Sequence, residues 1–485
     1  MECKRKNVVI VGGGITGLSA AFYLSKRMEE LQVPMDITLV EKNDRFGGKI
    51  QTLRRDGFII EQGPDSFLAR KLPIIALTKE LGLEDELTAT NPQAKANFIL
   101  HKNKLHPMPL GLVLGIPTQV SPFIRTGLIS PAGKIRAALD LVLPKRQHTS
   151  DESLGDFIRR RLGREVLDHI TEPLLAGIYA GDTQYLSLQA TFPQFKQLEE
   201  EHRSIILGML AGKKKPQSGS GLPDIARKSL FLTYKQGLAT LVDRLAAALQ
   251  SRSIRTMTGQ GVMRFVREEG RYKLTLDQGT ELEADAVIMA LPAFEAARLL
   301  PELPDARWLE HISYASVANV ALAYRQHDIP FPLNGSGFVV PRKEGRFITA
   351  CTWSSSKWPH TAPSGRLLLR TYVGRSGAQE WTRLSDEELI HGVVSDLRAL
   401  MGITAEPEFA EITRCHQSMP QYPVGHVERW GRLQAQLRSH TPGLYLCGAG
   451  YEGVGIPDCI QQGKRAAEQL LGFVQAGQSQ HLHGS

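Results

Sequence analysis

Short apolar runs, each followed by an amphipathic stretch, lie at both ends of the chain and predict an α/β fold. Residues 7–11 (NVVIV) and 37–40 (ITLV) are largely apolar runs of the kind that is buried in a parallel sheet. An amphipathic helix is expected directly after the first run. Near the other end, residues 443–447 predict a strand and residues 459–474 a helix, so we expect the chain to close on its first domain.

Between these ends the pattern changes twice. Helical periodicity dominates residues 105–212, where we expect an amphipathic helix through Leu162, capped at Ser150–Asp151. Beyond Pro301 the runs are of the β type, with one capped helix at 385–401. The strands expected there span 317–325, 337–340, 347–352, 367–373 and 408–414. They predict a second, largely antiparallel sheet that could form the wall of a cavity.

Shorter elements fill the remaining segments. Hairpins are expected at 50–61, with a turn at Asp56-Gly57, and at 97–104. The other expected elements are helices at 71–81, 163–179, 203–210 and 237–249 and strands at 261–266 and 284–291. Two polar segments, a linker at 213–221 and a frayed tail at 477–485, are expected to lack regular structure.

The first apolar run ends in GGGITG, a G-x-G-x-x-G pattern placed directly before the first helix. In dinucleotide-binding folds, glycines at the positions of Gly12, Gly14 and Gly17 permit a tight turn, a close approach to pyrophosphate and close helix packing. The second run ends near the usual spacing of a carboxylate that binds ribose hydroxyls. We therefore expect a dinucleotide on Gly12, Gly13, Gly14, Ile15, Thr16, Gly17, Glu41 and Lys42.

A second pair of glycines follows at once, in Arg45-Phe46-Gly47-Gly48-Lys49. This R-x-G-G-K run resembles the signature of the large flavoprotein family that includes amine oxidases, phytoene desaturases and porphyrinogen oxidases. The resemblance implies that the cofactor is FAD, bound without a covalent link. It also implies that Gly47, Gly48 and Lys49 contact it.

Composition narrows the class of protein. The chain has 485 residues, long enough for two or three domains, with 42% hydrophobic and 22% charged residues. Its five cysteines form no C-x-x-C pair, which fits reduced thiols in the cytosol and indicates no metal site. The net charge of +8 fits an anionic substrate or membrane surface better than nucleic acid, because no basic stripe with interleaved aromatic residues is present.

No segment predicts a membrane-spanning helix. The longest stretch without acidic or basic residues, 105–124, contains four prolines. The N-terminus leads straight into the first apolar run and leaves no room for a signal peptide. We expect a cytoplasmic protein, at most peripheral on the cytoplasmic face of the membrane.

Motifs of one narrower family are spread over the whole chain. They are residues 12–17, 45–49, 61–67, 172–182 (EPLLAGIYAGD), 419–426 (MPQYPVGH) and 448–460 (GAGYEGVGIPDCI). The first two belong to the wider flavoprotein family, whereas 172–182 and 448–460 are much more specific. With them the chain resembles the bacterial porphyrinogen oxidases of the haem pathway, which act on coproporphyrinogen III or protoporphyrinogen IX. That family implies a Rossmann-like α/β FAD domain, similar to p-hydroxybenzoate hydroxylase, an α+β substrate domain with a mixed sheet, and an inserted helical subdomain that faces a membrane.

The resemblance also implies how the chain divides. We expect a discontinuous FAD domain at 1–70, 227–300 and 436–485, a substrate domain at 71–106 and 301–435, and the helical subdomain with its linker at 107–226. Further contacts of FAD are expected at Gly63, Pro64, Asp65, Ser66, Val262, Gly448, Val454, Gly455 and Ile456. Asp458 is expected to cap the last helix, whose N–H groups would stabilise negative charge on the reduced flavin.

The implied reaction removes six hydrogens from a porphyrinogen in three rounds, and each round ends with oxygen reduced to hydrogen peroxide. The flavin accepts hydride and the pyrrole lone pairs assist its loss, so no catalytic acid or base is expected. Coproporphyrinogen III is the expected substrate, because its four propionates suit a basic protein. Hand-over of the product to a ferrochelatase and peripheral contact with a membrane are compatible with this function.

Candidate pocket residues come from charge and from the YAGD motif of the family. Lys71 is the preferred cation for a propionate because it follows the turn at 63–67; the others are Arg70, Arg342 and Arg375. The resemblance implies that Ala176, Gly177 and Ile178 line the pocket. We expect His426 to satisfy a hydrogen bond in the core rather than to take part in catalysis.

Three alternatives stay open. A protoporphyrinogen IX oxidase would differ in a few contacts at the substrate rim. A flavin amine oxidase would need an aromatic pair at the flavin, of which only Tyr451 is evident, and often a flavin-linking cysteine, whereas Cys447 lies back in a strand. An escort protein on the same fold would bind prenylated partners without flavin.

Overall fold

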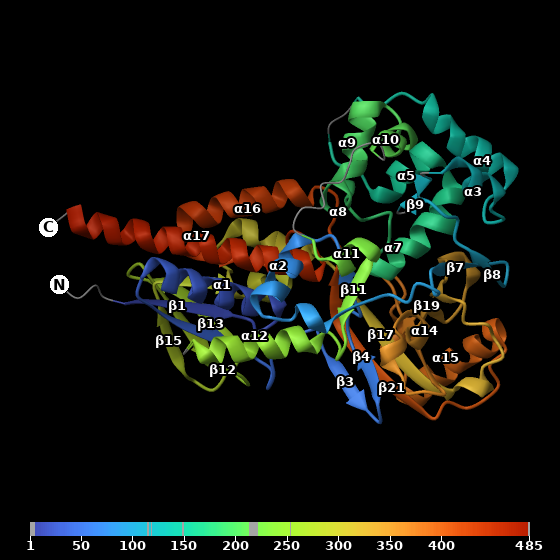
Figure 1. The fold of residues 1–485 in the computed structure, drawn as a ribbon. Coiled ribbons are helices and arrows are strands. Elements are labelled where there is room, and N and C mark those ends of the chain that lie inside the picture. The colour runs from blue at the N-terminus through green and yellow to red at the C-terminus, as the bar shows by residue number, and fades with distance from the viewer. Residues whose placement is uncertain are drawn as a thin grey trace.

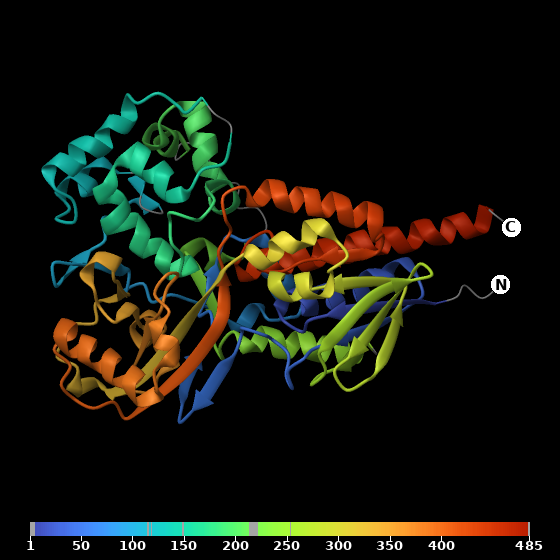
Figure 2. The same ribbon diagram turned by 180° about the vertical axis from the view of Figure 1, so that it is seen from behind.

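The computed structural model describes residues 5–113, 116–117, 119–147, 150–212, 222–252 and 254–483, so the expected linker at 213–221 lies outside the described residues. The chain forms a region with a parallel sheet near both termini, a region with a mixed sheet, and a helical region (Figure 1). The long helix α17 (Ile456–His483) runs from the end with the termini towards the place where the three regions meet (Figure 2).

The parallel sheet joins strands that lie far apart in the sequence. Its order is β12 (Arg255–Met257), β2 (Met35–Val40), β1 (Lys6–Val11), β16 (Ala286–Met289) and β22 (Leu444–Leu446), and all neighbours are parallel. Along β1, Val8 and Ile10 contact one hydrophobic core, whereas Val9 and Val11 contact another. Burial on both faces explains why this run is apolar throughout rather than alternating.

Two layers cover the parallel sheet. Helices α1 (Ile15–Leu31), α12 (Ala239–Ser251) and α17 pack on one face. The antiparallel strands β13 (Val262–Glu268), β14 (Arg271–Leu276) and β15 (Glu281–Ala284) and helix α13 (Ala293–Leu299) contribute to the core on the other. The expected end of α17 at residue 474 and the frayed tail from 477 are wrong, because the helix continues to His483. No proline follows Val474, and Gly477 alone does not stop the helix.

The second sheet confirms the five expected strands and the hairpin near residue 100. Its order is β21 (Phe409–Pro420), β17 (Tyr314–Arg325), β20 (Arg366–Val373), β19 (Ile348–Trp353), β18 (Gly335–Val339), β7 (Ala96–His101) and β8 (Lys104–Pro107). Only β18 and β7 pair in parallel; the other neighbours are antiparallel. Helix α15 (Asp386–Met401) packs on this sheet, and Ser385 and Glu388 form the capping box at its start.

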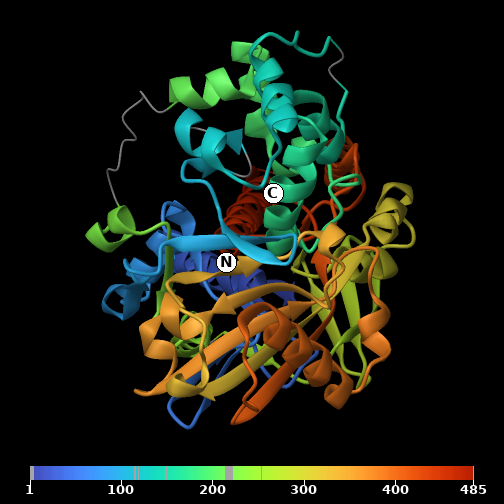
Figure 3. The same ribbon diagram turned by 90° about the vertical axis from the view of Figure 1, so that its right-hand side faces the viewer.

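The helical region lies above the second sheet and has its own core (Figure 3). It comprises α3 (Val120–Arg125), α4 (Pro131–Ala138), α5 (Leu154–Leu162), α6 (Arg164–Val166), a π-helical turn (Leu167–Thr171), α7 (Glu172–Tyr179), α8 (Leu188–Thr191), α9 (Pro193–His202) and α10 (Ile205–Gly212). The expected cap of α5 is wrong: Ser153, which directly precedes the helix, accepts the N–H of Asp156 at 3.0 Å. Asp151 instead accepts the hydroxyl of Ser187 at 2.6 Å.

Short elements connect these regions. Strands β3 (Thr52–Arg55) and β4 (Phe58–Glu61) form the expected hairpin, with positive φ at Asp56 and Gly57. The other short elements are β5 (Phe67–Leu68), α2 (Leu72–Glu80), β6 (Leu87–Ala89), β9 (Leu112–Val113), β10 (Ile116–Pro117), α11 (Asp224–Lys228), β11 (Phe231–Tyr234) and α14 (Ser354–Lys357). Helix α16 (His426–His440) was not predicted, because Gly425 precedes it and provides no side-chain cap.

No helix within the described ranges is long and apolar enough to cross a lipid bilayer.

Candidate active site

The glycine-rich turn between β1 and α1 combines tight packing with one open position. A Cβ at Gly12, where φ is +103°, would lie 2.5 Å from the carbonyl oxygen of Ala290. A Cβ at Gly17 would lie 1.8 Å from the carbonyl oxygen of Gly12. A Cβ at Gly14, in contrast, would meet nothing within 4 Å. Packing within the protein therefore requires glycine at positions 12 and 17, whereas Gly14 leaves space for a ligand to approach the backbone.

The R-x-G-G-K segment lies directly on this turn. The amide of Gly47 donates to the carbonyl of Gly13 at 2.9 Å, and Gly47 and Gly14 form a parallel β-bridge. A Cβ at Gly48 would stand 3.3 Å from the Cα of Gly14. The two glycine motifs therefore build one surface beside the N-terminus of α1.

Glu41 connects β2 to the same surface. Its Oε2 accepts the amide of Gly13 at 2.6 Å and its Oε1 accepts the amide of Asn43 at 2.9 Å. A carboxylate has about four acceptor sites, so capacity remains for a ribose hydroxyl. Lys42 points elsewhere, since its ammonium lies 3.5 Å from Glu295. Val262 is buried in the core below the sheet at the start of β13.

The C-terminal segment reaches the glycine turn from the other side. A Cβ at Gly448, where φ is +134°, would lie 3.9 Å from the hydroxyl of Thr16, and one at Gly463 would lie 2.4 Å from the Thr16 carbonyl oxygen. Helices α1 and α17 therefore pack in close contact. The expected N-cap at Asp458 is wrong, because α17 already begins at Ile456. Asp458 lies in the first turn instead, where its Oδ1 accepts Lys71 Nζ at 2.8 Å.

Residues 63–66 form a turn that the second sheet holds in place. A Cβ at Gly63 would lie 1.9 Å from the carbonyl oxygen of Lys49, so this turn packs on the R-x-G-G-K segment. Arg370 of β20 donates to the carbonyl of Gly63 at 2.8 Å, and Lys357 lies 2.9 Å from Asp65. Burial alone would raise the pKa of Asp65, but Lys357 and Arg370 hold it well below its ordinary value.

The end of α7 meets the start of α17. Asp458 contributes to the raised pKa of Tyr179, the last residue of α7, although burial is the larger cause. Val454, in the loop before α17, packs against the core of the helical region. On α7 itself, Ala176 is buried, whereas Gly177 and Ile178 are exposed. The structure thus places the YAGD motif beside the ion pair of Lys71 and Asp458.

The predicted cations differ in their partners. Lys71 pairs with Asp458, and Arg70 is exposed after β5. Arg375 is buried and lies 3.4 Å from Glu172, the first residue of α7, and Arg342 lies 3.9 Å from the same carboxylate. The geometry therefore places Arg375 at the junction of α7 with the second sheet, where it pairs with Glu172, rather than at an open pocket rim.

The structure confirms the structural role of His426. Its Nε2 lies 2.7 Å from the carbonyl oxygen of Tyr451, and burial lowers its pKa. Tyr451 is itself 1% exposed, with its ring 4.8 Å from that of Trp430. The ring of Tyr451 thus packs within the core of the parallel-sheet region.

Two contributors to the site were not predicted, namely Lys357 and Arg370. The segment 366–373 (RLLLRTYV) gave a signal, because Arg370 is a charged residue within an otherwise apolar strand. Its partner could not be identified, since Gly63 and Arg370 meet only through the tertiary fold.

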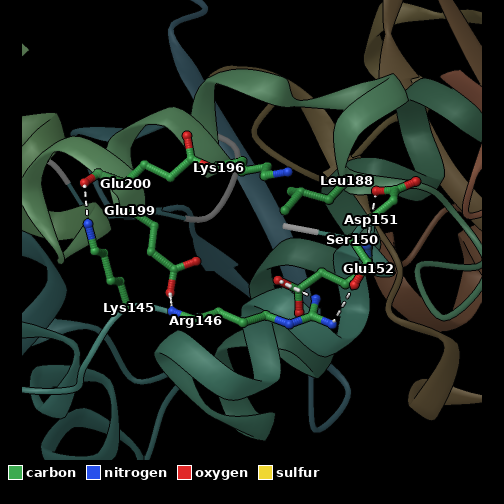
Figure 4. Close-up of a pocket in the computed structure, with 9 residues that line it drawn as sticks. All are labelled: Lys145, Arg146, Ser150, Asp151, Glu152, Leu188, Lys196, Glu199 and Glu200. Atoms are coloured by element: carbon green, nitrogen blue, oxygen red, sulfur yellow. Dashed lines mark hydrogen bonds and ion pairs between the residues drawn. The ribbon is translucent and has the colours of Figure 1, made fainter. Parts of the chain in front are cut away.

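A separate pocket lies in the helical region and is lined by Lys145, Arg146, Ser150, Asp151, Glu152, Leu188, Lys196, Glu199 and Glu200 (Figure 4). Its cavity of about 20 Å³ holds little more than one water molecule. Its charges pair with each other, as Arg146 does with Glu152 at 3.3 Å. Across the described residues, no cluster of histidine, cysteine and carboxylate side chains could hold a metal ion.

Comparisons with known proteins agree with this architecture. The sequence matches the flavin containing amine oxidoreductase family over residues 15–471. It is 48% identical to a coproporphyrinogen III oxidase of Bacillus subtilis (strain 168), over 98% of this chain and 100% of that one. It is 34% identical to a protoporphyrinogen oxidase of Bos taurus, over 96% and 98% of the two chains. A crystal structure from Exiguobacterium sp. 255-15, provisionally described as a protoporphyrinogen oxidase, superimposes with a TM-score of 0.85 at 37% identity, covering 96% and 99%.

Proposed function

The chain belongs to the flavin-containing amine oxidoreductase family, and from this premise we propose that it is an FAD-dependent oxidase that converts coproporphyrinogen III to coproporphyrin III. The observation that carries the proposal is the 48% identity, over essentially the full length of both chains, to the Bacillus subtilis protein of that name. Molecular oxygen is the proposed electron acceptor and hydrogen peroxide the second product. Removal of six hydrogens in three rounds balances three molecules of each.

The residues around the glycine turn fit FAD. Gly14 offers backbone that a pyrophosphate can approach, because no protein atom would meet a Cβ at that position. Glu41 keeps acceptor capacity for a ribose hydroxyl, and the N-terminus of α1 provides free N–H groups for phosphate. The ring is proposed to lie between the 63–66 turn and the start of α17. There the flavin supplies hydride acceptance, a reaction that no side chain can perform.

The chain positions the reactants. Arg370 and Lys357 fix the 63–66 turn through Gly63 and Asp65, and this fixed turn would orient a bound ring towards the substrate. Gly177 and Ile178 offer an exposed face on α7 to a broad apolar substrate. We assign no general base, because the substrate's own pyrrole nitrogens release the protons.

The choice of substrate rests on charge. Coproporphyrinogen III carries four carboxylates and protoporphyrinogen IX two, and the protein has a net charge of +8. Lys71 lies beside the YAGD motif, and its pair with Asp458 is partly exposed, with side chains 44% and 34% accessible. An incoming carboxylate could share this ammonium, because such a half-exposed pair is worth only about 0–1 kcal/mol.

The division of the chain into an FAD domain, a substrate domain and a helical subdomain is part of the proposal, as is peripheral contact with a membrane. Exposed apolar side chains in and beside the helical region support this contact: Leu110 before β9 is 76% exposed, Ile135 of α4 67% and Val142 66%. Co-sedimentation with anionic vesicles tests it. Loss of binding in an Ile135→Ser, Val142→Ser variant is the expected result.

One substitution tests FAD binding without disturbing the fold. Gly14 has φ −70° and ψ 177°, which any residue adopts, and no neighbour for a new side chain to strike. Gly14→Val should therefore fold normally but be purified without yellow colour, because the side chain fills the space meant for pyrophosphate. Gly431→Val is the matched control, since Gly431 in α16 also has no atom within 4 Å of its Cβ position. Normal flavin content in Gly14→Val would contradict the proposed site.

A second experiment separates the proposed function from the alternatives. The flavin of the wild-type protein should be released by acid and identified as FAD, since no covalent link is expected. A colourless protein would favour an escort protein. Peroxide release with putrescine or benzylamine, but not with a porphyrinogen, would favour an amine oxidase.

A further inference from the structure

Within the part of the chain that the structure describes, the ammonium of Lys49 has a carbonyl oxygen as a partner but no carboxylate. The ammonium donates to the carbonyl of Ser418 and lies 5.9 Å from the ring centroid of Tyr314. The other titratable groups that face it are the thiols of Cys415 and Cys459. Among the described residues, no carboxylate is within ion-pair distance, in contrast to Lys71 with Asp458.

These neighbours are all neutral near neutral pH. Burial raises the pKa of Cys459 to about 11 and that of Tyr314 to about 12, and it raises the pKa of Cys415 as well. Burial lowers the pKa of Lys49 itself, because surrounding protein disfavours the charged form. Lys49 is nevertheless exposed to solvent, so a ligand can reach its ammonium and supply the negative charge that the described neighbours lack.

The position of Lys49 indicates which ligand. It follows Gly48, whose Cβ position lies 3.3 Å from the Cα of Gly14, and its own carbonyl oxygen is packed against Gly63. On its other side, Cys459 belongs to the first turn of α17. The side chain thus lies amid the three segments assigned to FAD. It also remains accessible, so a bound ring could come close to the ammonium.

We propose that Lys49 is the counter-charge of the reduced flavin. The inference rests on the FAD dependence proposed above and adds an electrostatic role for this side chain. Hydride transfer moves two electrons and a proton from the substrate carbon to the neutral flavin, which gains one negative charge; the oxidised substrate then releases an N–H proton. The ammonium of Lys49 stabilises that negative charge together with the N-terminal end of α17.

Sulfite tests this role without any porphyrinogen, because it adds to oxidised flavin and gives an anionic adduct. Purified holoenzyme is titrated with sodium sulfite, and the loss of the visible flavin absorption gives the dissociation constant. We expect Lys49→Met and Lys49→Gln to weaken sulfite binding at least about tenfold, the usual scale for a charge-assisted contact. Lys49→Arg should stay within about threefold of wild type, because the positive charge is kept.

The matched control is Lys273→Met, which removes a surface lysine of β14 that pairs with Glu268. It should bind sulfite like wild type. The flavin midpoint potential gives a second readout and should be lower in both neutral variants than in the control. These readouts depend on flavin alone, so wild-type protein that binds FAD but oxidises no porphyrinogen would refute the proposed substrate without touching this inference.

Three results would overturn the inference. Equal sulfite affinity in wild type and Lys49→Met would show that the ammonium does not act on the flavin. Unchanged sulfite affinity with a raised KM for coproporphyrinogen III would assign Lys49 to a substrate carboxylate instead. Folded neutral variants that cannot be loaded with excess FAD would assign it to binding of the oxidised cofactor.

Discussion

The helical region and the interior beside the 63–66 turn each bury an arginine, and they satisfy it differently. Arg161 of α5 is 0% exposed, and each of its three nitrogens has an acceptor. Nε and Nη2 donate to the carboxylate and the carbonyl of Asp140 at 2.5 and 2.9 Å, and Nη1 donates to the carbonyl of Pro144 at 3.0 Å. The guanidinium of Arg161 is thus fully paired.

Arg370 of β20 is 2% exposed but far less satisfied. Its Nη2 donates to Gly63, whereas Nε and Nη1 have no hydrogen-bond acceptor among the described residues, and Nη1 is 3.8 Å from Asp65. Buried donors are normally paired, so unpaired ones call for an explanation.

The contrast separates a guanidinium that the fold pairs fully from one that it pairs only in part. A fully paired buried ion contributes to one particular packing and gains nothing from a cofactor. An incompletely paired one, such as Arg370 beside the 63–66 turn, could be completed by a bound group.

The largest expected effect on stability comes from removing the fully paired Arg161. Arg161→Met should destabilise the protein by about 3–5 kcal/mol, because it leaves Asp140 buried without its cation. Urea unfolding of apo- and holoprotein measures this, and the loss should be the same in both. A loss below about 1 kcal/mol would show that Asp140 finds other partners.

Glu61, at the end of β4 near the 63–66 turn, predicts a pH dependence of the protein's stability. Burial raises its pKa from 4.5 to about 7, although Leu238 and Thr52 donate to it. Because the folded-state pKa is raised, the folded protein binds the proton more tightly than the unfolded chain. The associated stability is present below pH 4.5 and is lost as pH rises through about 7.

The amplitude of this loss should be about 3 kcal/mol, and Glu61→Gln should lack it. The stability difference between wild type and Glu61→Gln, measured at intervals from pH 4.5 to 8, should therefore change in favour of the variant as pH rises. A difference that is independent of pH would contradict the raised pKa.

Arg370→Met should have a smaller effect on stability than Arg161→Met, about 1.5–3 kcal/mol, because it removes one hydrogen bond from a charged group. It should also weaken FAD binding, since the 63–66 turn loses its anchor at Gly63. Flavin release on dilution and urea unfolding measure the two effects. Unchanged flavin affinity would remove Arg370 from the site.

The smallest effect is expected at the partly exposed rim. Lys71→Ala should lower kcat/KM for coproporphyrinogen III by less than about tenfold, mainly through KM, and should lower it less for protoporphyrinogen IX. Asp458→Asn is the control, because it frees the Lys71 ammonium and should not weaken use of coproporphyrinogen III. An equal loss on both substrates in Lys71→Ala would exclude a selective contact.

Local sequence was sufficient for the elements whose physical demands are local. The apolar run of β1, the glycine turn after it and the capping box of α15 each need particular residues within a few positions. The prediction of the α5 cap was wrong because the sequence offers several polar residues before the helix, among them Ser150, Asp151 and Ser153. Only the contact with Ser187 in the folded protein shows the role of Asp151.

The rest depended on tertiary contacts. Arg370 lies on strand β20 and Gly63 in the loop after β4, and no rule of sequence spacing relates the two. The pairing of Lys71 with Asp458, and of Arg375 with Glu172, likewise appears only when the helical region, the second sheet and α17 meet. Motifs could thus identify a cofactor, whereas the partners of each charge needed the fold.

The most direct test of the proposed function is aerobic turnover of the purified holoenzyme with coproporphyrinogen III and with protoporphyrinogen IX, followed by porphyrin fluorescence and peroxide release. Both porphyrinogens are assayed under the same conditions. We expect coproporphyrinogen III to give the higher kcat/KM, with one hydrogen peroxide formed for each pair of electrons removed. A higher kcat/KM for protoporphyrinogen IX, or no oxidation of either substrate by yellow protein, would contradict the account.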